Sequence, residues 1–193
     1  KWVIAFGENL FGWNPFGWRF MMAVLGVGAV VLLHRVALRL FKHNLTAFLA
    51  GLFMAIDGMA IVHSRTALLD QTLMFLTLAA FVAVVMDRDW VRQKLEQGNQ
   101  LSLNRPWIYI AATLLALACA TKWSGVWFVV GIGLLVIFFE VRTRIALGHT
   151  FPIQKTLLNT LKLFPIVFVI LVVGYIATWY GWIASDAAYN RNW

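Results

Sequence analysis

Apolar residues fill most of the chain in long runs that short polar stretches separate. Runs of this kind are typical of helices that cross a bilayer, which need about 20 apolar residues each. The pattern predicts six spans, near 18–38, 45–62, 67–86, 107–121, 125–140 and 163–182. The fourth and fifth are short, about 15 residues each, and fit either steeply packed spans or a re-entrant pair.

Three stretches do not have the pattern of a span. Gly and Pro interrupt residues 1–17, which favours a short amphipathic helix in the membrane interface, within a first outer loop. The polar stretch at 87–106 predicts a loop that holds a surface helix ending near Gly98. Residues 183–193 are expected to begin a further outer loop. Because neither end has the pattern of a natural terminus, we expect the chain to be part of a longer protein.

Composition supports a membrane protein. Hydrophobic residues make up 62% of the 193 residues and charged residues only 12%, with a mean hydropathy of +0.79. A soluble domain carries about a quarter charged residues. The predicted fold class is therefore an all-α, multi-pass membrane bundle. The single Cys119 excludes an internal disulfide and a cysteine metal cluster.

The net charge of +8 is distributed unevenly between the two sides that six spans would define. One set of loops holds eleven of the sixteen Lys and Arg residues, and the positive-inside rule predicts that this side is cytoplasmic. These eleven are Arg35, Arg39, Lys42, Arg88, Arg92, Lys94, Arg105, Arg142, Arg144, Lys155 and Lys162. The outer side keeps Lys1, Arg19, Arg65, Lys122 and Arg191. With the charge explained in this way, no nucleic-acid partner is expected.

Four of the five outer cations lie at or beside predicted helix ends, where short turns bring side chains together. Arg and Lys bind phosphate oxygens well, Arg through its planar fork and Lys as a compact charge. We therefore predict that Arg19, Arg65 and Lys122 bind the phosphate of a donor. Asp70 is predicted to support this site by orienting Arg65 or Lys122. A contact with Arg65 requires a helix break between the two, because five residues turn a side chain by about 140°.

Four further residues are possible substrate contacts: His63, Asp57, Trp123 and Arg191. Asp57 falls inside the predicted second span, where a carboxylate is either functional or bonded to a neighbouring helix. The alternative role is a polar helix end for His63 and an aromatic belt for Trp123. For Arg19 and Arg191 the alternative is a side chain that extends to lipid headgroups.

The chain has no Walker loop, dinucleotide-binding glycine pattern, HExxH or nucleophile elbow. A phosphate donor is therefore expected to be lipid-linked rather than a cytosolic nucleotide. We predict no cofactor and no protein-held metal, and a role for a divalent ion stays open.

Several segments, in their order and spacing, resemble the protein O-mannosyltransferases, a family of GT-C glycosyltransferases. They are KWVIAFGENLFGWNPFGWRFMMAVLG at 1–26, SRTALLDQTLMF at 64–75, ATKWSGVW at 120–127 and YNRNW at 189–193. The resemblance implies a GT-C-type bundle that transfers mannose from polyprenyl-phosphate-mannose to Ser or Thr hydroxyls of secreted or membrane proteins, with inversion. The active face would be extracytoplasmic, in the plasma membrane of a bacterium or the endoplasmic reticulum membrane of a eukaryote.

The resemblance also implies roles for single residues. Arg19 matches the arginine expected at the carrier phosphate, and Arg65, Asp70 and Lys122 match motif positions. The family's catalytic base belongs to an acidic pair in the first outer loop, which would precede Lys1. No catalytic residue is therefore predicted within the chain itself, apart from the possible support from Asp70.

Two other interpretations of the sequence remain. One is another GT-C transferase, which would move lipid-linked arabinose or an amino sugar. The other is a transporter or scaffold bundle without enzymatic activity. Transporters favour polar residues at mid-membrane. Here the polar groups gather towards one face, and only Asp57 lies deeper, so a transferase is favoured.

Overall fold

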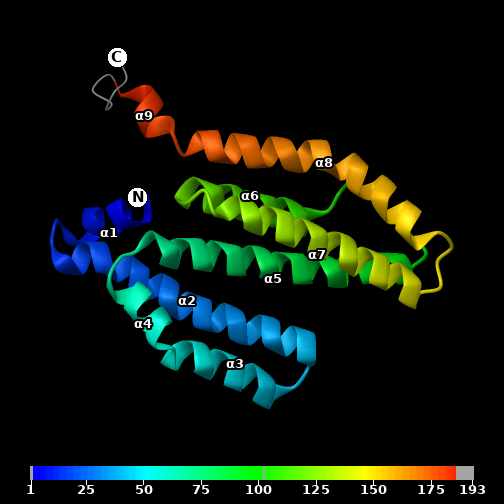
Figure 1. The fold of residues 1–193 in the computed structure, drawn as a ribbon, viewed down its shortest axis with the longest axis horizontal. Coiled ribbons are helices and arrows are strands. Elements are labelled where there is room, and N and C mark those ends of the chain that lie inside the picture. The colour runs from blue at the N-terminus through cyan, green and yellow to red at the C-terminus, as the bar shows by residue number, and fades with distance from the viewer. Residues whose placement is uncertain (1, 102, 186–193) are drawn as a thin grey trace.

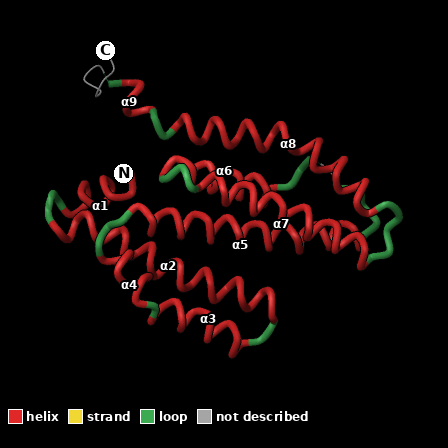
Figure 2. The backbone as a smooth tube through the Cα atoms, in the orientation of Figure 1, coloured by secondary structure: helices red, strands yellow, loops and turns green. Residues whose placement is uncertain are grey.

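The computed structural model describes residues 2–101 and 103–185. These residues form nine helices joined by short loops, and no strand (Figures 1 and 2). The helices are α1 (Trp2–Phe11), α2 (Pro15–Phe41), α3 (Asn44–Ile56), α4 (Gly58–Arg65), α5 (Leu69–Glu96), α6 (Pro106–Thr121), α7 (Gly125–Ala146), α8 (Pro152–Ala177) and α9 (Tyr180–Ala184). The predicted all-α class is confirmed.

Four helices are long and apolar enough to cross a membrane: α2, α5, α7 and α8. Helices α3 and α4 together make a fifth candidate, bent by 57° at the break between them. The apolar helix α6 has 16 residues, which extend over about 24 Å, less than the roughly 30 Å of a hydrocarbon core. The chain is an all-α, multi-pass membrane protein.

The break between α3 and α4 lies at Asp57, within the predicted second span. The backbone of Asp57 is extended, and its Oδ2 accepts a hydrogen bond from the Ala60 backbone N–H at 2.7 Å. This contact caps α4, since a carboxylate at the N-cap satisfies a backbone donor that has no partner within the helix. The predicted second span, near 45–62, is therefore divided into two helices that together stay a candidate span, because Asp57 with Gly58 favours a new helix start.

The polar stretch after the third predicted span does not form a separate surface helix. Helix α5 continues to Glu96 without a break. Gly98 follows it with a φ of +72°, so the helix ends near Gly98 as predicted. Asp87, Val91 and Leu95 are buried along this extension. Residues four apart lie on one face of a helix, so this face stays packed against the bundle and keeps the segment helical.

Helices α7 and α8 also differ from their predicted lengths. α7 has 22 residues and continues past position 140 to Ala146. α8 begins at Pro152, eleven residues before the predicted start of the last span, and ends at Ala177. Pro152 is suited to a first turn because its missing N–H would have no helical partner there. The four basic residues of the predicted 141–162 loop, Arg142, Arg144, Lys155 and Lys162, thus lie on helices rather than in a loop.

Helix α5 is the central element of the bundle. α2 packs against one side of it and α6 and α7 against the other, while α8 covers α6 and α3 packs along α2 (Figure 1). The buried cluster between these helices consists of Ala80, Ala83, Val84, Ala111 and Leu115. The three alanines of this cluster are small enough to let membrane helices approach closely.

The turns of the bundle fall into two groups. The α1–α2 turn, the α4–α5 link, the α6–α7 turn and the start of α9 lie towards one end, on the left in Figure 1. The α2–α3, α5–α6 and α7–α8 loops lie towards the other end. This grouping has the alternation of loops expected from the sequence, and we call the left-hand group the outer end.

Candidate functional site

An ion pair joins two motif residues at the outer end. Asp70 lies in the first turn of α5, and Lys122 is the C-cap residue of α6, with an extended backbone. The Lys122 Nζ donates to Asp70 Oδ1 at 2.8 Å, and the two side chains are 51% and 41% exposed. Asp70 therefore contacts Lys122 rather than Arg65, and the ammonium keeps an open side that can accept a ligand.

The link between α4 and α5 contains the helix break that the sequence required. Arg65 ends α4, Thr66 caps it, and Ala67 adopts a φ of +56° before α5 begins. The Thr66 Oγ1 donates to the Val62 carbonyl at 2.7 Å and closes the last turn. The Arg65 side chain is exposed and has no hydrogen bond to the described residues. Its guanidinium is therefore available to an anion at the outer end.

Asp57 and His63 differ in what they contact. The Asp57 carboxylate is used as the cap of α4 described above. This contact is local to the α3–α4 break and is neither of the two roles, functional group or bond to a neighbouring helix, that the sequence left open. His63, on α4, is half-buried and lies within electrostatic range of the Asp70 carboxylate. His63 is therefore close to the Lys122–Asp70 pair.

Arg19 lies near the start of α2 and is exposed. Helix α1 folds back on α2 so closely that a Cβ on Gly7 would lie 2.3 Å from the Gly17 carbonyl oxygen. Asn14 caps α2 by accepting from the Gly17 backbone N–H at 2.9 Å. These contacts place Arg19 at the same end as Lys122, but its convergence with Arg65 and Lys122 stays a prediction. Arg191 and Lys1 lie outside the described residues.

Aromatic rings extend from the Lys122 turn towards α9. The Trp123 ring lies 6.1 Å from that of Tyr175, which lies 6.1 Å from Trp179, which in turn lies 6.1 Å from Trp182. The Trp2 Nε1 also donates to the Thr178 carbonyl at 3.1 Å and ties α1 to the end of α8. Trp123 itself is 76% exposed. The residue that follows Lys122 thus presents an exposed aromatic ring at the α6–α7 turn, suited to a sugar or a hydrocarbon chain.

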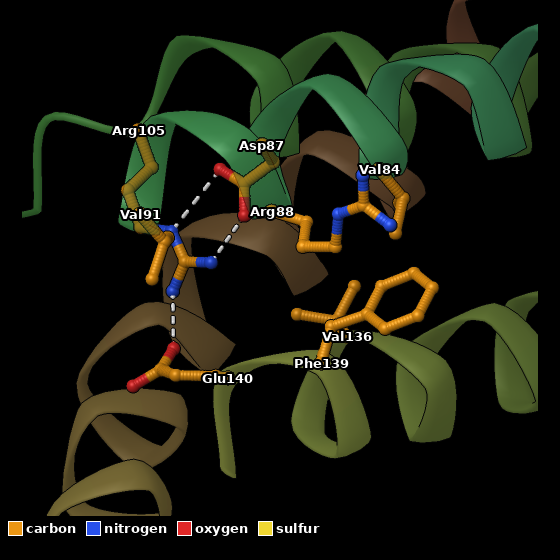
Figure 3. A pocket seen from close by; sticks show the side chains of 8 residues that line it. All are labelled: Val84, Asp87, Arg88, Val91, Arg105, Val136, Phe139 and Glu140. Carbon is orange, nitrogen blue, oxygen red and sulfur yellow. Dashed lines mark hydrogen bonds and ion pairs between the residues drawn. The ribbon is translucent and has the colours of Figure 1, made fainter. Parts of the chain in front are cut away.

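A second group of charges is buried near the other end of the bundle (Figure 3). Arg105 precedes α6, and its Nε donates to Asp87 Oδ1 at 3.2 Å while its Nη2 donates to Asp87 Oδ2. Its Nη1 donates to Glu140 Oε2 on α7 at 2.7 Å. None of these three side chains is more than 3% exposed. We call these residues, with Arg144 and Asn159, the buried charge cluster.

Glu140 is shared among several donors in this cluster. Arg144, one turn further along α7, donates from Nη2 to Glu140 Oε1 at 2.8 Å. Asn159 on α8 donates from Nδ2 to both Glu140 oxygens at 3.2 Å. The cluster therefore joins α5, α6, α7 and α8. Its two arginines balance its two carboxylates.

The buried charge cluster has the properties of a structural element. Burial disfavours the charged form of Arg105, but Asp87 and Glu140 outweigh burial and raise the pKa of the guanidinium above its ordinary value. Removing one partner of a buried pair leaves an uncompensated charge. The cavity beside the cluster holds only about 10 Å³, room for no more than about one water. This cluster thus has no space for a substrate.

From the sequence, Arg105 and Arg144 were interpreted only as loop cations, and Asp87 and Glu140 were not singled out. A signal for the cluster was present, because Asp87 directly follows the third predicted span and Glu140 is the last residue of the fifth. Carboxylates at such depth need a partner. Which of the many nearby arginines would supply it depends on how the helices pack.

Comparison with known proteins places the chain in a family. The sequence profile described as dolichyl-phosphate-mannose-protein mannosyltransferase matches residues 1–180. The chain is 37% identical over 209 residues to the polyprenol-phosphate-mannose–protein mannosyltransferase of Mycobacterium tuberculosis. It is 39% identical over 204 residues to the protein of that name from Mycolicibacterium smegmatis, and 29% identical over 204 residues to that from Corynebacterium glutamicum.

These alignments cover 99% to 100% of the chain but 39% of each relative. The chain thus spans about two-fifths of the length of the curated relatives it matches. No solved structure matches it. The resemblance seen in the sequence motifs is confirmed: the chain belongs to the dolichyl-phosphate-mannose-protein mannosyltransferase family.

Proposed function

We propose that the protein containing this chain transfers mannose from a polyprenyl-phosphate-mannose donor to Ser or Thr hydroxyls of secreted or membrane proteins. The chain's part is to bind the carrier phosphate, through Lys122 with Arg19 and Arg65. Membership of the family and the names of the relatives support the reaction. The observation that carries the assignment of the site is the half-exposed Lys122–Asp70 pair at the outer end.

The pair is suited to hold an anion without losing the lysine's orientation. Asp70 occupies one of the three donor directions of the Lys122 ammonium and leaves two. A phosphate oxygen can therefore bind while the carboxylate keeps the side chain in place. Asp70 itself lies at the N-terminus of α5, where the helix dipole favours negative charge.

The roles proposed for these residues follow from where charge develops during mannose transfer. The bond between the anomeric carbon of mannose and the phosphate oxygen breaks as the acceptor hydroxyl attacks from the opposite face, which inverts the configuration. The hydroxyl proton passes to a carboxylate base, and negative charge collects on the departing phosphate. Cations held at that phosphate stabilise the transition state more than the ground state. The resemblance assigns the base to the acidic pair that would precede Lys1.

We also propose that the outer end faces the extracytoplasmic side. The support is the distribution of Lys and Arg between the two groups of turns. Cysteine labelling tests it, with Trp13→Cys at the α1–α2 turn and Asn99→Cys in the α5–α6 loop, in a background in which Cys119 is replaced by Ser. We expect an impermeant reagent added outside to label position 13 only. Labelling of position 99 from outside would refute the sidedness.

The function is tested with the full-length protein, a polyprenyl-phosphate-mannose donor and a Ser/Thr-containing acceptor peptide. Changing Lys122, Arg19 or Arg65 to Ala, one at a time, should each reduce transfer at least tenfold, because each removes a charged donor worth about 1.5–3 kcal/mol. Arg35→Ala, an exposed arginine at the other end of α2, is the matched control. Equal losses in Arg35→Ala would contradict the assignment, and transfer of a different lipid-linked sugar in preference to mannose would favour another GT-C activity.

A further inference from the structure

A basic groove lies between α5 and α7 near the end of the bundle opposite the Lys122–Asp70 pair. Its volume is about 330 Å³. It is lined by Arg88, Arg92, Phe138, Phe139, Arg142, Thr143, Ala146 and Leu147. Residues four apart share a helix face, so α5 presents two arginines and α7 an arginine with aromatic and aliphatic residues.

The charge of this groove is not neutralised by its surroundings. Arg88 donates to Asp89 Oδ1 at 2.7 Å, but Asp89 also accepts from Arg39 at 2.6 Å. Arg92 pairs with Glu96 at 2.8 Å in an exposed contact. With Arg142 included, four arginines face two carboxylates, an excess of two positive charges.

Arg142 is the cation that remains free in this group. Its side chain is exposed and has no hydrogen bond or ion pair to the described residues. Arg144, two residues further on, instead forms an ion pair with Glu140 in the buried charge cluster. The cluster beneath the groove is itself neutral, so it does not cancel the positive charge of the groove.

The groove also offers apolar surface to its ligand. The Arg88 guanidinium carbon lies 5.5 Å from the centre of the Phe139 ring, so two residues that line the groove are in cation–π contact; Figure 3, which is centred on the adjoining buried cavity, shows these two side chains. Phe138 is 55% exposed beside it. A free phosphate would use the arginines and leave these rings uncovered. A phospholipid would satisfy both, with its headgroup on the arginines and its chains on Phe138 and Leu147.

We infer that this groove binds an anionic phospholipid of the surrounding leaflet, with the lipid phosphate held by Arg88, Arg92 and Arg142. The location supports this occupant, because α5 and α7 are both membrane-spanning candidates and the groove lies near the ends where they leave the apolar region. Basic pockets between membrane helices are suited to such headgroups. Nothing in the inference depends on the transferase reaction.

The experiment uses the full-length protein in phosphatidylcholine nanodiscs that contain a small fraction of phosphatidylglycerol, with bound lipid counted by native mass spectrometry after release. Each arginine near a lipid headgroup contributes about a fivefold change in affinity, so Arg142→Gln should weaken phosphatidylglycerol retention about fivefold and the Arg92→Gln/Arg142→Gln pair about 25-fold. Arg35→Gln, exposed and outside the groove, should leave retention unchanged. Thermal unfolding in pure phosphatidylcholine should be the same for all variants.

Two results would overturn the inference. An equal loss in Arg35→Gln would mean that diffuse surface charge holds the lipid rather than this groove. Displacement of phosphatidylglycerol by millimolar inorganic phosphate would mean that the arginines bind a free anion and that Phe138 and Leu147 contribute nothing to lipid binding. If the double variant fails to fold, the single Arg142→Gln decides, because it breaks no internal ion pair of the described residues.

Discussion

The Lys122–Asp70 pair and the buried charge cluster each include one carboxylate of the central helix α5, and they differ in exposure. Asp70 and Asp87 are 17 residues apart on α5, which separates them by about 26 Å along the helix. Asp70 contacts Lys122 with both side chains about half exposed, whereas the Asp87 side chain is 3% exposed and contacts the buried Arg105. The open pair keeps donors for a ligand, and the buried cluster uses its donors within the protein. The exposure of the charged side chains, rather than the presence of an ion pair, thus distinguishes a candidate binding site from a contact that only stabilises the fold.

The largest expected effect is a loss of stability when the buried charge cluster is broken. Arg105→Ala leaves Asp87 and Glu140 buried with one partner fewer, and breaking a buried pair costs about 3–5 kcal/mol. We expect a strong fall in the thermal unfolding midpoint of the full-length protein in detergent. Arg35→Ala is the control. An unfolding midpoint like that of the control would mean that the cluster does not hold these helices together.

The next largest expected effect is a loss of mannose transfer when the exposed Lys122–Asp70 pair is broken. Asp70→Asn removes the charge that orients Lys122 but keeps the side chain's shape, so we expect transfer to fall about tenfold with an unfolding midpoint close to that of the unchanged protein. An exposed pair contributes only about 0.2–1 kcal/mol to stability. In the double variant with Lys122→Ala, the loss should equal that of Lys122→Ala alone. Additive losses would show that Asp70 acts independently of Lys122.

The smallest effect distinguishes a cap from a substrate contact at Asp57. Asp57→Ala removes the cap of α4 and should cost about 1 kcal/mol of stability. Asp57→Ser keeps an N-cap oxygen without the charge and should restore both stability and transfer. If the serine variant folds normally but transfers no better than the alanine variant, the carboxylate has a role in the reaction.

The sequence was most informative where a charge interrupts an apolar run. Lys122 and Asp70 stand out for this reason, and both candidate partners of Asp70 could be named from the motif. The choice between Arg65 and Lys122 could not be made, because it depends on α6 ending beside the start of α5. Such a contact, between residues 52 apart in the chain, is set by helix packing.

The surroundings of Arg105 and Asp57 in the structure could not be predicted from the sequence, for two different reasons. Arg105 lies in a polar stretch rich in charges, and only its burial against α5 and α7 separates it from its neighbours. Asp57 was placed within a span by its apolar surroundings, although Asp followed by Gly is a recognised helix-breaking signal. At Asp57 hydropathy outweighed a local signal that the structure uses, whereas at Arg105 no local signal was present.

The most direct test of the central claim is the affinity of the full-length protein in nanodiscs for polyprenyl phosphate, which in the proposed reaction is the product that retains the carrier phosphate. We predict that Lys122→Ala weakens this binding at least tenfold, with the unfolding midpoint nearly unchanged, because a charged donor to the phosphate is lost while only an exposed ion pair is broken. Binding equal to that of the unchanged protein would contradict the assignment of the open pair as the phosphate site.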